Sequence, residues 1–413
     1  MDFITTSMHR TKIVIGCAFF ALGVFILSGM AATEKSLVPL EHDAYIWQRS
    51  WRPALLEAIA TNKNLVRAWR VLAAQVSPTG KLLPVSINPK ALEGSGPLLI
   101  MVVRIDGQLP NFDQLRLLDE VLALHQQWRD QGLKVAGIEI DHDCGTAKLP
   151  GYAKFLAKLR GRLERTTQLS ITALPAWLAS SHLVDVLGAI DESVLQVHSV
   201  QNPSNGLFDQ VQAGKWIAEY GNKSPTAFRV ALPTYGSRIG FDDFGNVAFV
   251  ESESALGQGQ TKAQELIVAP ESVRRLMNSL NRDAPKNFRG YAWFRLPTNE
   301  DQRAWSTATW RALIQGKPLT QAVGIIARPT SDPRLFDFIA RNDGETDASP
   351  PTRIKLAGNC SDADGLGVYE AKEIEGRLWL VRNTPSLLHP QHEISVGWAR
   401  CEDNPSKELH GQS

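Results

Sequence analysis

Three carboxylates occupy every second position of one short stretch of the chain. Glu139, Asp141 and Asp143 lie two residues apart, and Ile138 and Ile140 alternate with them. Successive side chains of a β-strand point to opposite faces, so this spacing predicts a strand with one apolar face and one acidic face. Like charges about 6.6 Å apart, from the ~3.3 Å rise per residue, raise each other's pKa. Such a row can supply a protonated acid beside an ionised carboxylate.

Two other interpretations of this stretch are open. A solvated edge strand would also carry acidic outer positions, but an amphipathic segment follows at once, which favours a covered parallel strand. A metal site would use Asp141, His142 and Asp143, but adjacent strand residues point to opposite faces, so His142 would leave the cluster. The sequence contains no His-Glu-x-x-His motif and no paired-cysteine motif. We therefore expect neither a metal nor a cofactor.

Strand-like runs alternate with helical patterns eight times before residue 320. This alternation predicts parallel strands joined by crossover helices, and eight units in about 270 residues match a (β/α)8 TIM barrel. The alternative is an open, doubly wound sheet, but no Gly-x-Gly-x-x-Gly motif opens a helix after the first strand. The predicted strands are Ala44–Gln48, Val66–Leu72, Leu98–Ile105, Val135–Asp141, Leu169–Ala173, Val194–His198, Phe228–Leu232 and Gly290–Phe294.

The remaining segments complete a predicted α/β architecture with a small C-terminal all-β module. A long polar segment between Tyr235 and Pro270 exceeds an ordinary βα loop, so we expect a lid or a small hairpin there. After residue 320 the pattern changes to short strands, expected at Arg353–Ala357, Gly367–Ala371, Leu378–Arg382 and Glu393–Trp398. The predicted parts are a leader over 1–31, the barrel over 40–318, a β-rich accessory module over 320–402 and a disordered tail over 403–413.

The N-terminus has the features of a targeting segment. Arg10 and Lys12 precede an apolar run over residues 13–30, and the small residues Ala31 and Ala32 follow it. This order predicts a signal peptide cleaved after Ala31 or Ala32. The run is also long enough to remain as a single membrane anchor. We therefore expect a periplasmic or secreted protein, membrane-anchored if the segment stays uncleaved.

If the protein is exported, its cysteines are expected to form disulfides. In an oxidising compartment disulfides form and persist. The mature chain keeps Cys144, Cys360 and Cys401, an odd number. Cys360 and Cys401 both lie in the C-terminal module and are expected to pair, which leaves Cys144 as a free thiol. The alternative is three unpaired core cysteines.

Composition limits the classes of partner. Of the 413 residues, 43% are hydrophobic and 21% charged, which is typical of a folded globular protein. The net charge of +1 and the lack of a basic patch argue against a nucleic-acid partner. Eleven tryptophans weakly favour a protein that stacks aromatic rings on sugars. We expect membrane contact only through an uncleaved N-terminal segment.

Polar and aromatic residues gather where most of the predicted strands end. In a TIM barrel the C-terminal ends of the strands form the active site, so these side chains are expected to converge. Glu139 is the deepest carboxylate and is expected to pair with a lumen arginine such as Arg229 or Arg104. The expected substrate-binding residues are Tyr45, Trp47, Gln48, Arg104, Thr172, Gln196, His198, Tyr235, Trp293 and Arg295.

Carboxylates beside aromatic rings and hydrogen-bonding side chains suit a carbohydrate. Cleavage of a glycosidic bond needs one protonated carboxyl for the leaving oxygen and a second group that stabilises the developing cation. Asp143, at the strand tip, is the candidate acid. Asp141 would lie below it and tune its pKa, and Glu139 completes the candidate catalytic set.

Residues 137–143, Gly-Ile-Glu-Ile-Asp-His-Asp, resemble the fourth-strand motif of chitinase-like glycosidases, Asp-Gly-x-Asp-x-Asp-x-Glu. Glu139 and Asp141 would match the second and third acids, and Asp143 the catalytic glutamate. Two positions depart from the motif: Ala136 replaces the first aspartate, and Asp143 is one methylene shorter than glutamate. Trp293 would match the tryptophan that ends the eighth strand in that family.

A second resemblance covers nearly the whole mature chain. The segments Tyr45–Arg49, Glu139–Cys144, Ser170–Trp177 and Leu195–His198 resemble an exported bacterial family catalogued as domain of unknown function 3142. The resemblance implies a barrel related to glycoside hydrolases and does not imply an activity.

Three functions fit these observations. The first is an exported glycoside hydrolase that acts on a polysaccharide. The second is a carbohydrate-binding barrel without catalysis, in envelope or exopolysaccharide assembly. The third is a metal-dependent deacetylase or other hydrolase. The cost of holding three carboxylates together without a role favours an enzyme.

Overall fold

The computed structural model describes residues 40–107, 113–198, 206–242, 244, 247–251, 263–301, 303–405 and 410–412. The predicted leader over residues 1–31 lies outside these ranges, so it stays a prediction. Within the described ranges, no helix is both long and apolar enough to cross a membrane.

Eight parallel strands close into a barrel. Their order around the ring is β1-β12-β8-β7-β6-β5-β4-β2, and β2 pairs with β1 to complete the ring. Closure confirms the predicted (β/α)8 barrel and excludes the open, doubly wound sheet. The short strand β3, Leu82–Pro84, adds antiparallel to β2. The barrel strands are β1 Glu41–Ile46, β2 Ala68–Val76, β4 Leu98–Ile105, β5 Val135–His142, β6 Gln168–Ala173, β7 Glu192–Gln196, β8 Ala227–Pro233 and β12 Phe288–Phe294.

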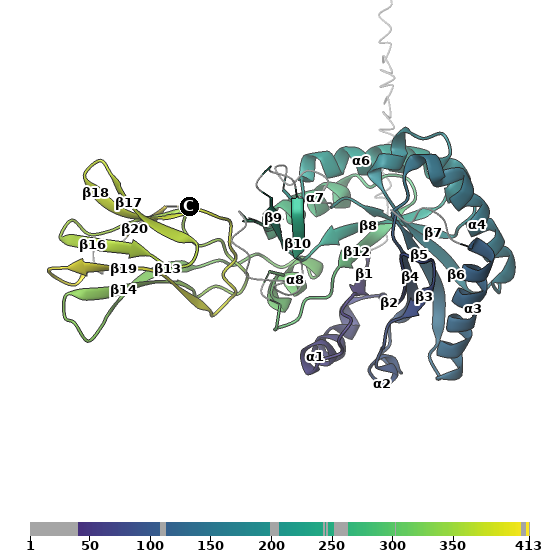
Figure 1. Cartoon of the computed structure of the whole chain (residues 1–413), viewed down its shortest axis with the longest axis horizontal. Coiled ribbons are helices and arrows are strands. Elements are labelled where there is room, and N and C mark those ends of the chain that lie inside the picture. The colour runs from purple at the N-terminus through teal and green to yellow at the C-terminus, as the bar shows by residue number, and fades with distance from the viewer. Residues whose placement is uncertain are drawn as a thin grey trace, which may run out of the picture. The chain divides into compact units, whose positions relative to one another are not determined.

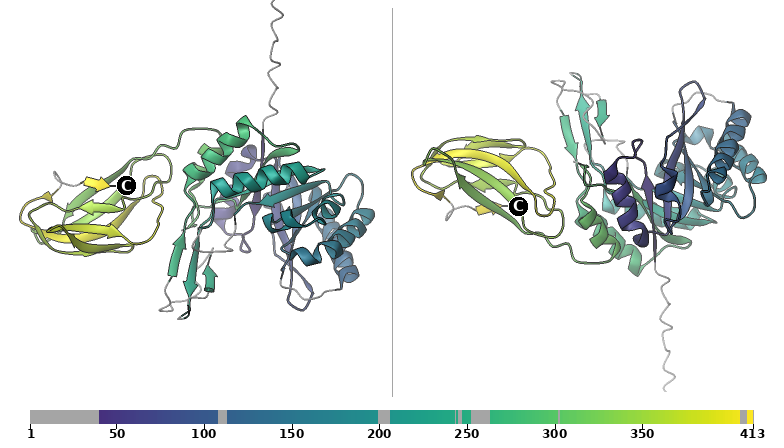
Figure 2. Two further views of the ribbon diagram at one scale, coloured as in Figure 1. Left: turned by 90° about the horizontal axis from the view of Figure 1, so that it is seen from above. Right: turned by 90° about the horizontal axis from the view of Figure 1, so that it is seen from below.

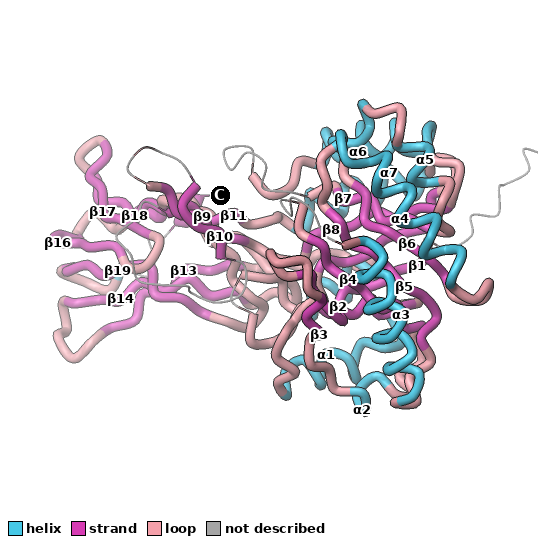
Figure 3. The backbone as a smooth tube through the Cα atoms, turned by 45° about the vertical axis from the view of Figure 1, so that its right-hand side comes forward, coloured by secondary structure: helices cyan, strands magenta, loops and turns pink. Residues whose placement is uncertain are grey.

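Helices follow the strands and lie outside the ring, as Figures 1 and 3 show. The third helix, α3, begins where the Asp113 carboxylate accepts hydrogen bonds from the backbone N–H groups of Leu115 and Arg116, at 3.0 and 3.1 Å. The helices are α1 Pro53–Asn62, α2 Pro89–Leu92, α3 Gln114–Asp130, α4 Leu149–Arg162, α5 Leu183–Leu187, α6 Gln210–Lys223, α7 Pro270–Arg282 and α8 Thr307–Ile314.

The main hydrophobic core lies between the strands and the helices. Ile138 and Ile140 of β5 are fully buried in it, together with Val121 and Trp128 of α3. Alternate strand residues point the other way, into the lumen, because side chains alternate along a strand. The period-2 pattern of the acidic stretch therefore places Glu139 and Asp141 inside the barrel.

The long segment before α7 forms a small antiparallel sheet. Its strands are β9 Ser237–Phe241, β10 Val247–Glu251 and β11 Ala263–Leu266, in the order β10-β9-β11. In both views of Figure 2 these strands lie outside the barrel. The insertion is therefore a three-stranded sheet rather than a simple hairpin. The Gly-Gln-Gly-Gln part of the predicted lid, residues 257–260, lies outside the described residues.

Residues after the barrel form two four-stranded antiparallel sheets. One has the order β13-β14-β19-β16 and the other β17-β18-β15-β20, and Phe338, Leu380 and Val396 share one core between them. Four of these strands, β13, β14, β16 and β20, lie beyond the four predicted from the sequence. Their bounds are β13 Val323–Pro329, β14 Leu335–Asn342, β15 Arg353–Lys355, β16 Cys360–Gly365, β17 Tyr369–Ile374, β18 Arg377–Arg382, β19 Glu393–Cys401 and β20 His410–Gln412.

Two features concern the end of the chain. Cys360 and Cys401, which we expected to pair, form a disulfide with an S–S distance of 2.08 Å, and Cys144 is a buried free thiol. We expected a disordered tail over 403–413, but His410–Gln412 pair with β15 as strand β20. The expectation is wrong for these three residues, because backbone pairing with an open strand edge needs no apolar side-chain pattern.

Candidate functional site

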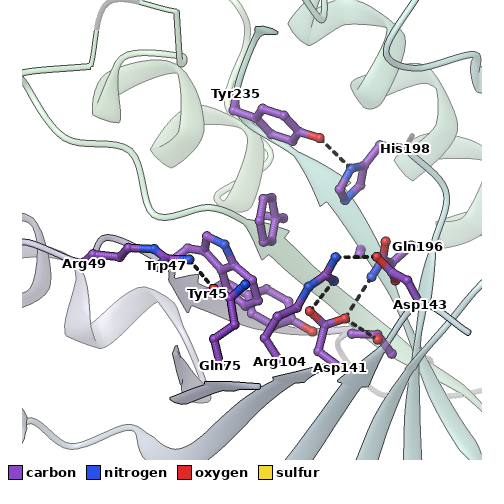
Figure 4. Close-up of a pocket in the computed structure, with 13 residues that line it drawn as sticks. Tyr45, Trp47, Arg49, Gln75, Arg104, Asp141, Asp143, Gln196, His198 and Tyr235 are labelled. Atoms are coloured by element: carbon purple, nitrogen blue, oxygen red, sulfur yellow. Dashed lines mark hydrogen bonds and ion pairs between the residues drawn. The ribbon is translucent and has the colours of Figure 1, made fainter. Parts of the chain in front are cut away.

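A pocket of about 280 Å³ opens at the C-terminal ends of the barrel strands. Figure 4 shows its polar side chains converging from several strands. The lining residues are Tyr45, Trp47, Arg49, Gln75, Arg104, Asp141, Asp143, Thr172, Gln196, His198, Ala231, Tyr235 and Phe294. This is where TIM-barrel enzymes have their active sites.

Arg104 joins the two aspartates of the pocket. It lies on β4, where it is paired in register with Asp141 of β5. Its Nη1 contacts Asp141 Oδ2 at 2.7 Å, and its Nη2 contacts Asp143 Oδ2 at 2.6 Å (Figure 4). One guanidinium therefore sets the orientation of both carboxyl groups through charge-assisted hydrogen bonds.

Asp141 is held from two further strands. Its Oδ1 accepts hydrogen bonds from Thr172 Oγ1 at 2.5 Å and from Gln196 Nε2 at 3.4 Å. Both oxygens thus have donors, and only 2% of the residue is exposed. These contacts hold the Asp141 carboxyl in one orientation below the tip of β5.

Asp143 has a different environment. Its side chain is 30% exposed, and among the described residues Oδ1 has no hydrogen-bond partner although that atom is buried. Burial and the neighbouring charge of Asp141 raise the pKa of Asp143, while Arg104 opposes the shift. A carboxyl with a raised pKa and one oxygen without a hydrogen-bond partner among the described residues is suited to holding a proton and giving it up.

Aromatic rings form the opposite side of the pocket. Phe294, at the end of β12, packs against Trp47 with ring centroids 5.1 Å apart and stacks on His198 at 5.6 Å. Tyr45 and Tyr235 pack against the same phenyl ring at 5.6 and 5.4 Å. A cluster of this kind offers flat apolar faces to a sugar ring.

His198 is neutral in this cluster. Its Nδ1 lies 3.2 Å from the Tyr235 hydroxyl, and burial lowers the pKa of His198 to about 4. In the described part of the chain its buried Nε2 has no partner. His198 therefore presents an uncharged ring nitrogen for a hydrogen bond rather than a positive charge.

Glu139 lies below the pocket, not in it. It is fully buried, accepts a hydrogen bond from the Tyr45 hydroxyl at 2.8 Å and pairs with Arg70 of β2. We expected a lumen arginine as its partner, and Arg70 is one, although it is neither Arg229 nor Arg104, the two examples that we named. Arg104 lies nearer the strand end, where it meets Asp141, and Arg229 is turned toward Glu192.

Arg70 is the centre of a buried ionic network in the lower barrel. It contacts Glu139, Glu192 and Asp43, the last at 2.8 Å. Arg229 adds a 3.0 Å contact to Glu192. A small apolar cluster lies beside this network, and it consists of Tyr45, Val102, Val194, Ala231 and Ala292. The sequence analysis did not identify Arg70, because one arginine within an apolar strand does not reveal which charges it will meet.

Three predicted binding residues do not line the pocket. Trp293 is fully buried on the outer face of β12, where its Nε1 donates to His42 Nδ1 at 3.0 Å. Arg295 pairs with Asp301 at 2.6 Å, and the Gln48 side-chain amide donates to the Leu296 carbonyl at 2.9 Å. Trp293 was assigned to the lumen by residue type, but Ala292 and Phe294 face the lumen instead.

The pocket also contains residues that the sequence analysis missed. Phe294 lines the pocket at the end of β12, where we had expected its neighbour Trp293. Arg49 follows β1, and Gln75 lies at the end of β2. The signal for Gln75 was available, because it is a polar residue at the end of an apolar strand. Arg49 lies in the loop after β1, and a loop has no side-chain periodicity from which one could predict that the Arg49 side chain faces the pocket.

The described residues contain no group of three or more His, Cys, Asp and Glu side chains that could hold a metal ion. His142, the third ligand of the metal hypothesis, packs against Tyr152 on the outer face of β5. Its Nδ1 lies 3.2 Å from the Ile105 carbonyl oxygen.

Comparisons with known proteins agree with this fold. Residues 95–299 match the family described as Domain of unknown function (DUF3142), and residues 325–402 match Domain of unknown function (DUF8456). No curated protein matches the chain.

Among solved structures, the Bacillus cereus spore cortex-lytic enzyme SleL is similar, with 12% sequence identity and a TM-score of 0.50 over 68% of this chain and 75% of that one. A chitinase from Chromobacterium violaceum ATCC 12472 has 13% identity and a TM-score of 0.49 over 67% of this chain and 98% of that one. At such identities the likeness concerns the fold. The (β/α)8 barrel is therefore similar in fold to that of SleL, and residues 95–299 of this chain match the DUF3142 family model.

Proposed function

We propose that this protein is an exported glycoside hydrolase that cleaves a polysaccharide, with Asp143 as the general acid. The observation that carries the proposal is the environment of Asp143 at the tip of β5. Its carboxyl lies beside Asp141, keeps one oxygen without a partner among the described residues, and has a raised pKa. An aromatic cluster lies across the same pocket. The Cys360–Cys401 disulfide supports export, since disulfides persist in oxidising compartments.

The reaction needs one proton transfer and one water. Asp143 gives its proton to the leaving glycosidic oxygen as the bond between that oxygen and the anomeric carbon breaks. The negative charge of Asp141 stabilises the positive charge that develops on the sugar ring. Water then adds to the anomeric carbon, and the proton that it loses restores Asp143. Each cleavage thus consumes one water and leaves one new reducing end.

The test is to incubate the purified protein with a panel of bacterial and plant polysaccharides. Reducing ends and binding are measured on the same samples. Product whose formation depends on Asp143 supports the proposal. Binding without product across the panel supports the second candidate, a carbohydrate-binding barrel without catalysis in envelope or exopolysaccharide assembly. That candidate is favoured by Arg104, which contacts Asp143 and acts to lower the pKa of its carboxyl.

The pH dependence of cleavage follows from the pKa of Asp143. Because the acid must be protonated, activity is highest below the raised pKa and falls as pH rises through it. Arg104 lowers that pKa, so Arg104→Gln should move the alkaline limb of the kcat profile to higher pH. Arg116→Gln, on the outer surface of α3, is the matched control. An alkaline limb that stays in place in Arg104→Gln would assign it to another group.

Gly107 lets the chain approach Asp143 closely. A Cβ atom at Gly107 would lie 1.8 Å from the Asp143 carbonyl oxygen, so Gly107→Ala must change the spacing between Gly107 and Asp143. A displacement of this order reduces kcat by about 100-fold, because acid catalysis depends on position. Gly145→Ala is the control, since nothing lies within 4 Å of its added Cβ. Equal kcat values for the two variants, both folded by circular dichroism, would contradict the prediction.

A further inference from the structure

Arg49 is a pocket residue that the proposed reaction does not use. It lies in the loop after β1, is exposed to solvent and donates a hydrogen bond to Gln75 Oε1. Within the described part of the chain it has no carboxylate partner. Figure 4 shows Arg49 and Asp143 at opposite ends of the group of pocket side chains, with Arg104 between them.

The charges of the pocket leave Arg49 without compensation. Two arginines and two aspartates line the pocket, and Arg104 already contacts both Asp141 and Asp143. When Asp143 holds the proton that catalysis requires, Asp141 alone offsets Arg104. Glu139 lies below and pairs with Arg70, so it does not compensate Arg49. The catalytically competent pocket therefore carries one net positive charge, located at Arg49.

The Gln75 side chain adds a donor beside this charge. Its Oε1 already accepts from Arg49, so the other end of the amide, Nε2, can only donate. A planar guanidinium with a neighbouring N–H donor matches the two oxygens of a carboxylate. Neutral hydroxyl groups would not need an arginine at this place.

We propose that the substrate is an acidic polysaccharide and that Arg49, with Gln75, binds the carboxylate of a uronic-acid unit. This inference rests on the proposed function, because it identifies the substrate class of the same pocket. Arg49 thus determines specificity, while Asp143 acts on the bond.

The experiment compares each acidic polymer with its uncharged counterpart, so that the effect of the carboxylate or sulfate group is isolated. Polygalacturonate and hyaluronan are each tested beside their carboxyl-reduced forms, and dextran sulfate beside dextran. Binding is measured by titration calorimetry on Asp143→Asn protein, and cleavage by reducing ends on protein with Asp143 intact. The variants are Arg49→Gln and the control Arg116→Gln, which removes the same charge from the outside of the barrel.

We expect at least one carboxylated polymer to bind more tightly than its reduced form. Arg49→Gln should reduce that preference about 10-fold, in line with a hydrogen bond to a charged group, and Arg116→Gln should not. Added salt should weaken the preference, because Arg49 is exposed.

Other outcomes separate the two proposals. Equal binding and cleavage of the acidic and reduced forms would overturn this inference and leave the hydrolase intact. An Arg49-dependent preference without cleavage of any polymer would support the inference and overturn the hydrolase. Preference for dextran sulfate over every carboxylated polymer, or no binding to any acidic polymer, would overturn the carboxylate assignment.

Discussion

Replacing Asp143 with asparagine should lower the rate of glycosidic cleavage by about 100-fold to 10,000-fold, the range for losing a positioned general acid. The amide oxygen can still accept from Arg104 Nη2, which now contacts Asp143 Oδ2 at 2.6 Å, but the amide has no acidic proton to donate. Binding of the polysaccharide should remain, because the proton is transferred in the transition state. Initial rates of reducing-end release and Kd values on the same polymer measure the two effects.

Asp143→Glu is the matched control for this change. It keeps an acidic proton and adds one methylene, so it should retain more activity than Asp143→Asn. Cleavage by Asp143→Asn at the unaltered rate would reject the acid assignment. A fall in affinity as large as the fall in rate would instead make Asp143 a binding residue.

Replacing Arg70 with methionine should lower the free energy of unfolding by about 3–5 kcal/mol, because it leaves the buried carboxylate of Glu139 without its charged partner. Arg70 is fully buried and contacts Asp43, Glu139 and Glu192. Burial already raises the pKa of Glu139, with Arg70 acting against the shift, so its ionised form depends on the arginine. Urea unfolding followed by fluorescence measures the change.

Arg116→Met is the matched control for Arg70→Met. Arg116 forms an exposed pair with Glu120 at 2.9 Å, so its loss should cost less than about 1 kcal/mol. Adding Glu139→Gln to Arg70→Met should recover part of the stability, because it removes the charge that lost its partner. A loss below about 1 kcal/mol for Arg70→Met would mean that the network contributes little to folding.

Much of the barrel could be predicted because its strands are buried on both faces. Each of the eight predicted strands overlaps a barrel strand, and the period-2 spacing of Glu139 and Asp141 gave the correct face of β5. On β12, residue type did not reveal which side chains face the lumen and which face the outer core. Trp293 and Phe294 are both large and aromatic, so only the register of the folded strand separates the core tryptophan from the pocket phenylalanine.

The C-terminal module was harder to predict for a different reason. Strand β16, Cys360–Gly365, contains Ser361, Asp362 and Asp364, which have no strand preference. Its pairing with β19 holds it in place, and such long-range pairing cannot be inferred from local pattern. In the site, the predicted barrel already places β1 beside β2, but the direction of the Arg49 side chain in the loop after β1 could not be inferred from the sequence.

Tyr45 belongs both to the pocket and to the buried ionic network, because its ring packs against Phe294 while its hydroxyl donates to Glu139 at 2.8 Å. In the network, replacing Arg70 leaves Glu139 without its charged partner. In the pocket, Arg49, Gln75 and Gln196 can be exchanged one at a time without removing a charge from that network. The polymer that the pocket binds can therefore be altered by substitution without changing the ion pairs that hold the barrel together.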